Sequence, residues 1–171
     1  TTGVPKGAML THANIYANTI QCGVWFPGLE AGVERIMGVL PFFHVFAMTA
    51  VMNMSIYLGA VIIMHPRFEL DTVLEDIKKK KPTLFDGVPT MFGAINAHPK
   101  LKESDLKSIK ACISGGAPLP LEVKQRFEKL SGCKLVEGYG LTESSPVATC
   151  NPFDGEVKEG SIGLPLPGTI I

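Results

Sequence analysis

Short β-rich runs alternate with helix-like segments along most of this chain, and that alternation constrains the fold more than any other feature. Segments with helical spacing of apolar residues, such as Val73, Leu74 and Ile77, or with helix start and stop signals separate the β-rich runs. Strands separated by helices pair in parallel, because the crossover leaves room for a helix. The sequence therefore predicts an α/β fold, a mostly parallel sheet with helices on both faces. The β-rich runs cover residues 35–40, 60–64, 83–85, 109–113 and 134–136.

Length and charge restrict the domain count and the partners. A chain of 171 residues is long enough for one sizeable core, which predicts a single domain. Sixteen basic and sixteen acidic side chains give zero formal net charge. Nothing electrostatic therefore indicates nucleic acid or an anionic membrane as the main partner.

Residues 45–64 carry no charged side chain, and by length alone such a run could span a bilayer. Gly59 divides the run, and Thr49, Asn53 and Ser55 lower its hydrophobicity. We therefore expect a buried helix of about a dozen residues followed by a central strand at 60–64. The competing hypothesis, a membrane protein anchored through this run, predicts dependence on detergent.

The cysteines and histidines form no recognised metal pattern. The four cysteines are widely spaced without a C-x-x-C pair, and the four histidines do not complete a zinc motif. We therefore expect reduced, buried thiols. With no signal-peptide pattern in these residues, the expected location is cytoplasmic, with at most peripheral membrane contact.

Residues 138–143, Gly-Tyr-Gly-Leu-Thr-Glu, place an aromatic ring, a hydroxyl and a carboxylate close together after a short strand. Two glycines allow a sharp turn and a close approach to a ligand. The ring of Tyr139 suits a nucleotide base, Thr142 a phosphate oxygen, and Glu143 a divalent cation. An ordinary tight turn capped by Thr142 is the alternative.

Three further segments carry groups that suit an anionic ligand. Residues 1–7, Thr-Thr-Gly-Val-Pro-Lys-Gly, combine hydroxyls, glycines and Lys6, but lack the Gly-Lys-Ser/Thr order of a P-loop. His44 follows two phenylalanines at a strand end, where α/β folds place ligand contacts, although a core histidine has the same context. Gly115 and Gly116 follow another strand and offer bare backbone to a flat ligand.

Six motifs occur in one order: Thr-Thr-Gly-Val-Pro-Lys-Gly, Leu-Thr-His-Ala-Asn, Pro-Phe-Phe-His, Ser-Gly-Gly-Ala-Pro-Leu, Gly-Tyr-Gly-Leu-Thr-Glu and Gly-Ser-Ile-Gly-Leu-Pro-Leu-Pro-Gly. Together they resemble the adenylate-forming, or AMP-binding, superfamily over the whole chain. Within it the chain is most similar to the acyl-CoA synthetases, especially long-chain fatty-acid–CoA ligases. The resemblance implies that residues 1–171 are a single partial domain, the central part of the AMP-binding N-terminal domain, without the C-terminal lid domain.

The resemblance also implies roles for individual residues. Lys6, His44, Thr142 and Glu143 match catalytic positions, with Glu143 as the magnesium ligand and His44 near the acyl carboxylate. The positions that match nucleotide binding are those of the phosphate loop, the adenine and acyl pocket lining, and the segment around Tyr139. They are Thr1, Thr2, Gly3, Lys6, Gly7, Gly115, Gly116, Ala117, Pro118, Glu137, Gly138, Tyr139, Gly140 and Thr142.

The implied activity has two steps. A carboxylic acid, expected to be a fatty acid, reacts with ATP in the presence of Mg²⁺ to give acyl-AMP and pyrophosphate, and CoA then displaces AMP. Because both ends look cut, we expect residues 1–171 alone to be inactive. The alternatives are an aryl-CoA ligase or another adenylate-forming enzyme, and a non-catalytic nucleotide-binding module.

Overall fold

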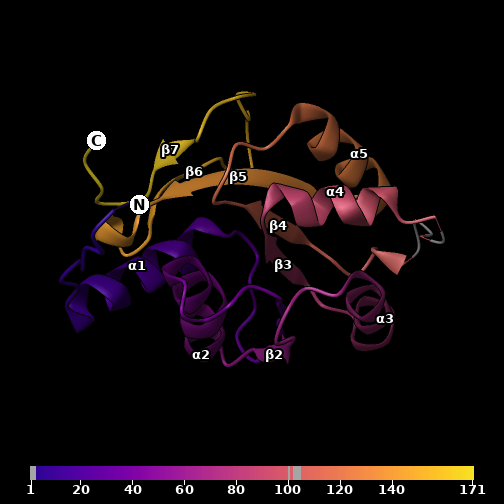
Figure 1. Cartoon of the computed structure of the whole chain (residues 1–171), viewed down its shortest axis with the longest axis horizontal. Helices are drawn as coiled ribbons and strands as arrows, with labels where there is room; N and C mark the ends of the chain where they lie inside the picture. Colours follow the sequence, from indigo (N-terminus) through magenta and orange to yellow (C-terminus); the bar gives the residue numbers. More distant parts are fainter. Residues whose placement is uncertain (1–2, 100, 102–104) are drawn as a thin grey trace.

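A computed structural model describes residues 3–99, 101 and 105–171. In this part of the chain one sheet has the strand order β2-β1-β3-β4-β5-β6-β7 (Figure 1). The strands from β2 to β5 are parallel, whereas β5 pairs antiparallel with β6, and β6 with β7. The mostly parallel sheet is thus confirmed. The strands are β1 Arg35–Gly38, β2 Val61–Met64, β3 Leu84–Gly87, β4 Ala111–Ser114, β5 Lys134–Gly140, β6 Val147–Cys150 and β7 Leu164–Pro165.

Helices cover both faces of the sheet (Figure 1). One face packs against α1 (His12–Trp25), a π-helix (Ala47–Asn53) and α2 (Met54–Leu58). The other packs against α3 (Leu70–Lys80), α4 (Pro89–Ala97) and α5 (Leu121–Ser131).

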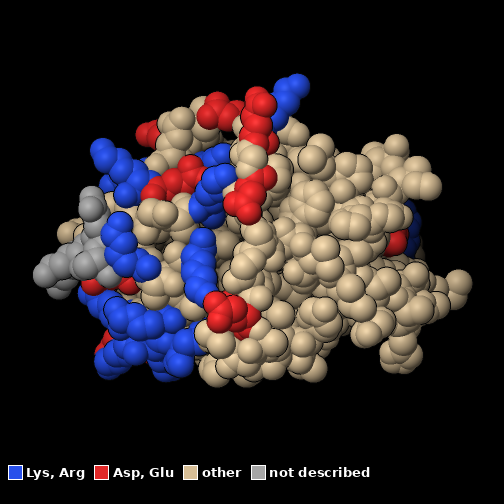
Figure 2. Space-filling view, turned by 180° about the vertical axis from the view of Figure 1, so that it is seen from behind, with Lys and Arg blue, Asp and Glu red and all other residues tan. Residues whose placement is uncertain are grey.

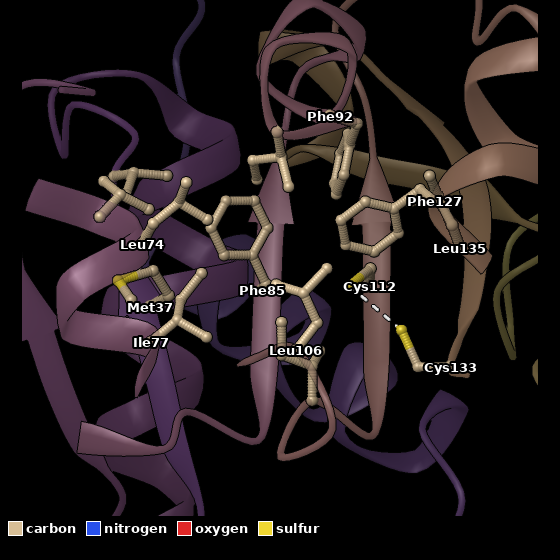
Figure 3. Close-up of a cluster of buried hydrophobic side chains, with 14 of the residues drawn as sticks. Met37, Leu74, Ile77, Phe85, Phe92, Leu106, Cys112, Phe127, Cys133 and Leu135 are labelled. Carbon is tan, nitrogen blue, oxygen red and sulfur yellow. Dashed lines mark hydrogen bonds between the residues drawn. The ribbon is translucent and has the colours of Figure 1, made fainter. Parts of the chain in front are cut away.

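Successive strand residues feed two separate cores, because side chains alternate across a sheet. In β3, Leu84 points to the core under α1 and α2, whereas Phe85 points to the core under α3, α4 and α5. Figure 3 shows that second core, in which Phe92 lies between Phe85 and Phe127 with ring centroids 5.5 and 5.0 Å apart. Both contacts are edge-to-face, a favoured aromatic geometry.

Charged side chains are unevenly distributed over the surface. Figure 2 shows Lys and Arg gathered on the half of one face that carries α3, whereas the other half is nearly free of charge. Helix α3 ends in three exposed lysines, and each pairs with a carboxylate. Lys78 lies 3.1 Å from Asp105, Lys80 lies 2.7 Å from Asp76, and Lys79 pairs with Glu75. These lysines also suit the negative end of the helix dipole.

The uncharged run at residues 45–64 is a helix followed by a strand, as expected, but two details differ. The helix begins as the π-helix and continues as α2, and Gly59 ends it in a left-handed conformation with a φ of 61°. The strand that follows, β2, is at the edge of the described sheet and not central. The prediction erred because strand order depends on non-local pairing. No helix among the described residues is long and apolar enough to cross a membrane.

The glycines of residues 138–143 do not form the predicted sharp turn. β5 continues through Gly138, Tyr139 and Gly140, which pair with β6. The chain reverses later, around a 3₁₀ turn at Thr142–Ser144. Residues 168–171, whose β-rich pattern resembles the start of a strand, form none.

Asp86, near the end of β3, is a carboxyl group buried in the sheet. It is only 2% exposed, and its Oδ1 atom has no hydrogen-bond partner among the described residues. Burial raises the pKa of Asp86 to about 7, although a hydrogen bond with the Ile113 backbone partly opposes this. The folded protein therefore retains a proton that the unfolded chain loses at much lower pH.

We expect Asp86→Asn to change how stability depends on pH. Between the ordinary Asp pKa of about 4 and the folded value of about 7, wild-type stability falls as pH rises, because the folded state binds the extra proton. The variant lacks this loss. The difference between its unfolding free energy and that of the wild type therefore shifts in favour of the variant over that interval by a few kcal/mol, on the order of 1.4 kcal/mol per pH unit. Urea unfolding from about pH 4 to about pH 8 measures it. Parallel pH curves for the two proteins would contradict the prediction.

Candidate active site

A cavity of about 600 Å³ opens at the carboxyl edge of the parallel strands. This is the edge where ligands bind in open α/β sheets. Its lining comes from four parts of the chain: the N-terminal loop, the segment after β1, the end of β4, and the β5–β6 connection. The lining residues predicted from the sequence are Lys6, His44, Gly115, Gly116, Gly138, Tyr139, Gly140, Thr142 and Glu143.

The register of β4 and β5 explains why two glycine-containing motifs meet here. Ser114 lies beside Glu137, so Gly115 lies next to Gly138. A Cβ on Gly115 would lie 3.1 Å from the Phe46 ring and 3.6 Å from the Gly138 carbonyl oxygen. Gly116 has a φ of 81°, a conformation that favours glycine. The backbone itself is therefore the cavity wall at this point.

Gly140 brings the two strands around the cavity unusually close together. A Cβ there would overlap the Pro146 carbonyl, approaching its carbon to 2.8 Å. The pairing of β5 with β6 shifts register between Tyr139 and Gly140, a bulge of the kind that redirects side chains near active sites. Only glycine permits this approach.

The bulge delivers Thr142 and Glu143 on a short 3₁₀ turn, with both side chains exposed at the cavity. The Leu141 N–H donates to the Pro146 carbonyl at 3.0 Å and to Ser144 Oγ at 2.9 Å. The turn is thus fixed by its own backbone and by Ser144. Sequence reasoning did not single out Ser144.

His44 follows β1, and its ring orientation is fixed by its own loop. Its Nδ1 atom accepts the Phe46 N–H at 3.2 Å, so the proton of the neutral ring is on Nε2. His44 is exposed and lines the cavity. It offers Nε2–H as a donor and is not the buried core histidine of the alternative interpretation.

Other predicted site residues lie outside the cavity lining. Ala117 and Pro118 are exposed beyond Gly116. Glu137 borders a separate small hollow, where its carboxylate accepts the Leu119 N–H at 3.3 Å. It thereby ties the loop after β4 to β5. Gly3 and Gly7 are exposed near Lys6 without lining the cavity, and Thr1 and Thr2 lie outside the described residues.

Helix α1 is tied to the C-terminal part of the chain, including Val147 in the cavity wall, through side chains that the sequence did not single out. The buried Asn18 carboxamide donates to the Val147 carbonyl at 2.8 Å and accepts the Val147 N–H at 3.0 Å. Gln21 donates to the Pro167 carbonyl at 2.7 Å and Trp25 to the Asn151 carbonyl at 3.2 Å. Their spacing of three and four residues puts all three on one helix face.

A second hollow of about 580 Å³ lies between α1 and α2. Its lining is mostly apolar and aromatic, including Ile15, Tyr16, Ile56 and Tyr57, and its other polar side chains are those of His12, Thr19 and Asn53. The described residues that line it include no lysine or arginine for a triphosphate and no carboxylate for a metal ion. The cavity at the strand ends, with Lys6 and Glu143, is therefore the candidate active site.

Known proteins share both the sequence and this architecture. A long-chain-fatty-acid–CoA ligase of Bacillus subtilis is 54% identical over 169 residues, which are 99% of this chain and 30% of that protein. ATP-bound MatB from Rhodopseudomonas palustris superposes with a TM-score of 0.88 at 29% identity, over 98% of this chain and 32% of that one. A benzoate CoA ligase from Burkholderia xenovorans LB400 gives 0.87 at 30% identity, over 96% and 33%.

The chain therefore spans about a third of the length of the proteins that it resembles. The family model of AMP-binding enzymes matches residues 1–171. That match and the Bacillus relative confirm the family resemblance found in the six motifs, and the chain belongs to the AMP-binding enzymes.

Proposed function

We propose that the full-length protein is an acyl-CoA ligase that activates a fatty acid with ATP and transfers the acyl group to CoA. The observation that carries the proposal is the meeting of Lys6, His44, Thr142 and Glu143 in one cavity, from segments far apart in the sequence. The 54% identity to a long-chain-fatty-acid–CoA ligase supports the substrate class.

Lys6 and Thr142 would bind the triphosphate. Lys6 is an exposed cation on the cavity wall and suits the β- and γ-phosphates, while the Thr142 hydroxyl suits an oxygen of the α-phosphate. The flat glycine wall and Tyr139, which is 42% exposed, would receive the adenine.

Glu143 fits a magnesium ion bound together with ATP. Among the described residues, no group of three or more His, Cys, Asp and Glu side chains could hold a metal by itself. Mg²⁺ is usually held by one or two carboxylates together with phosphate oxygens and water, so a single exposed carboxylate beside the phosphates suffices. When bound, the ion would supply positive charge against the phosphates.

The first step needs positioning more than it needs a protein nucleophile. A carboxylate oxygen of the acid forms a bond to the α-phosphorus, and the bond from that phosphorus to the bridging oxygen of pyrophosphate breaks. His44 Nε2–H would donate to the acid, while Lys6 and Thr142 stabilise the charge on the phosphates. In the second step the CoA sulfur attacks the acyl carbon, and AMP leaves.

An aromatic acid is the second candidate substrate. A benzoate CoA ligase shares the architecture at 30% identity, and the Phe46 and Tyr139 rings border the cavity. Acid-dependent ATP–pyrophosphate exchange, measured with long-chain, medium-chain and aromatic acids, separates the two. Higher kcat/KM for a long-chain acid is the expected result; no exchange with any acid would overturn the proposed function.

Glu143→Gln should lower acid-dependent exchange by about 100- to 1,000-fold in the full-length protein, because it removes the charge that binds the cation. The loss should lessen at high Mg²⁺ concentration. Glu156→Gln, which changes an exposed carboxylate outside the cavity lining, is the matched control and should leave exchange unchanged. Equal exchange in both variants would remove Glu143 from the mechanism.

Gly140→Ala should raise the KM for ATP and lower kcat, because the new methyl group overlaps the Pro146 carbonyl and displaces the turn at Thr142–Ser144. Gly93→Ala is the control, since nothing lies within 4 Å of its added Cβ in α4. That change should add about 0.5–1 kcal/mol of stability and leave the kinetics unaltered. Wild-type kinetics in Gly140→Ala would show that the close approach is dispensable.

A further inference from the structure

Cys112 and Cys133, which are 21 positions apart, meet in the core beneath α4 and α5. Their Sγ atoms lie 3.7 Å apart, the contact drawn as a dashed line in Figure 3. Cys112 is in β4, whereas Cys133 directly precedes β5. The pair thus lies toward the start of the strands, away from the candidate active site at their carboxyl ends.

Cys133 has the surroundings of a reactive thiol. Its sulfur lies 3.1 Å from Ser131 Oγ, and its N–H donates to the same oxygen at 3.2 Å. The hydrogen bond with Cys112 lowers the pKa of Cys133, a shift that exceeds the opposing effect of burial, and Ser131 lowers it further. A lower pKa increases the fraction of thiolate, the reactive form.

Cys133 is also the less deeply buried member of the pair. It is 7% exposed and lines two surface hollows of about 300 and 370 Å³, whereas Cys112 is completely buried. A small oxidant can therefore reach Cys133 first. Cys112 is placed behind it, in contact with its sulfur.

The two remaining cysteines provide an internal contrast. Cys22 and Cys150 belong to the other core and lie close enough that, besides burial, Cys150 raises the pKa of Cys22, but among the described residues no sulfur–sulfur hydrogen bond joins them. Burial raises the pKa of each thiol to about 12. A sulfur–sulfur hydrogen bond and a lowered pKa therefore occur together only at Cys133, whose partner Cys112 has a pKa raised by burial.

We propose that Cys112 and Cys133 form an oxidisable dithiol that a peroxide converts into a reversible disulfide. The Cys133 thiolate attacks one oxygen of hydrogen peroxide, the O–O bond breaks, and Cys133 sulfenic acid and hydroxide result. The Cys112 sulfur then attacks the sulfenic sulfur, the S–S bond forms, and the S–O bond breaks. The hydroxide that leaves the sulfenic sulfur takes up the Cys112 proton and departs as water.

The movement that this reaction needs is small. The sulfurs must approach from 3.7 Å to about 2.0 Å, the length of a disulfide bond. Cys133 lies outside the ladder of β5 and follows Gly132, which ends α5 in a left-handed conformation with a φ of 76°. The turn can therefore adjust without breaking strand pairing. Reduction by a dithiol exchanges the bond back to two thiols.

The test uses the reduced full-length protein, treated with hydrogen peroxide and then with an alkylating reagent. Peptide mapping should find a Cys112–Cys133 cross-link, lighter by two hydrogen atoms than the two thiol peptides. The link should disappear after a dithiol reductant is added. Cys22 and Cys150 should remain alkylatable at the same peroxide dose.

Single variants separate the roles of the two thiols. Cys112→Ser should accumulate sulfenic acid at Cys133, which dimedone traps, whereas Cys133→Ser should leave Cys112 unoxidised. Cys22→Ser and Cys150→Ser are matched controls and should form the cross-link as the wild type does. If a serine variant fails to fold, peptide mapping of the peroxide-treated wild type still shows whether the Cys112–Cys133 cross-link forms. Equal oxidation of all four cysteines, or no cross-link while all four thiols persist, would overturn the proposal.

Discussion

The register of the parallel strands is the constraint on which the rest of the structure depends. Gly87 lies beside Ser114, and Ser114 beside Glu137, so β3 and β4 end at one edge, beyond which β5 continues to Gly140. A shift of one residue would exchange the two faces of a strand and put core residues such as Phe85 on the wrong side. It would also separate Gly115 from Gly138. The hydrophobic cores and the cavity are therefore fixed by the same pairing.

Helix α1 then connects the two ends of the candidate site. It begins shortly after Lys6, with Thr11 as its N-cap, and Asn18 pairs with both backbone polar groups of Val147. Val147 follows the turn that carries Thr142 and Glu143. This buried carboxamide therefore helps to fix the acidic turn relative to the helix that follows the cationic loop. Its loss would leave a buried N–H and carbonyl unsatisfied, at a cost of about 1–3 kcal/mol each.

Local patterns were sufficient to predict elements whose determinants are local. The spacing of Val73, Leu74 and Ile77 predicted the buried face of α3, and Gly59 ended a helix where expected. Four of the six motifs also supply residues that meet at the cavity, because strand ends in a parallel sheet share an edge, whereas residues 10–14 and 160–168 do not line it.

Features that depend on distant segments could not be read in the same way. The glycines beside Tyr139 suggested a turn, but β6 supplies a pairing partner that keeps them extended. Cys112 and Cys133 come together only because β4 and β5 are neighbours, and their spacing along the chain carries no signal. The role of Asn18 depends on the backbone of a residue 129 positions away.

The cavity wall owes its shape to backbone more than to side chains. Gly115, Gly116 and Gly140 each exclude a side chain by contact or by conformation. Lys6 and Glu143 are the charged side chains among the described residues that line the cavity. Under the proposed function, this backbone surface would receive the nucleotide whichever acid is activated. Discrimination between acids would then depend on apolar neighbours such as Phe46 and Val147. Such a division fits the resemblance of the chain both to a relative named for a long-chain fatty acid and to one named for benzoate.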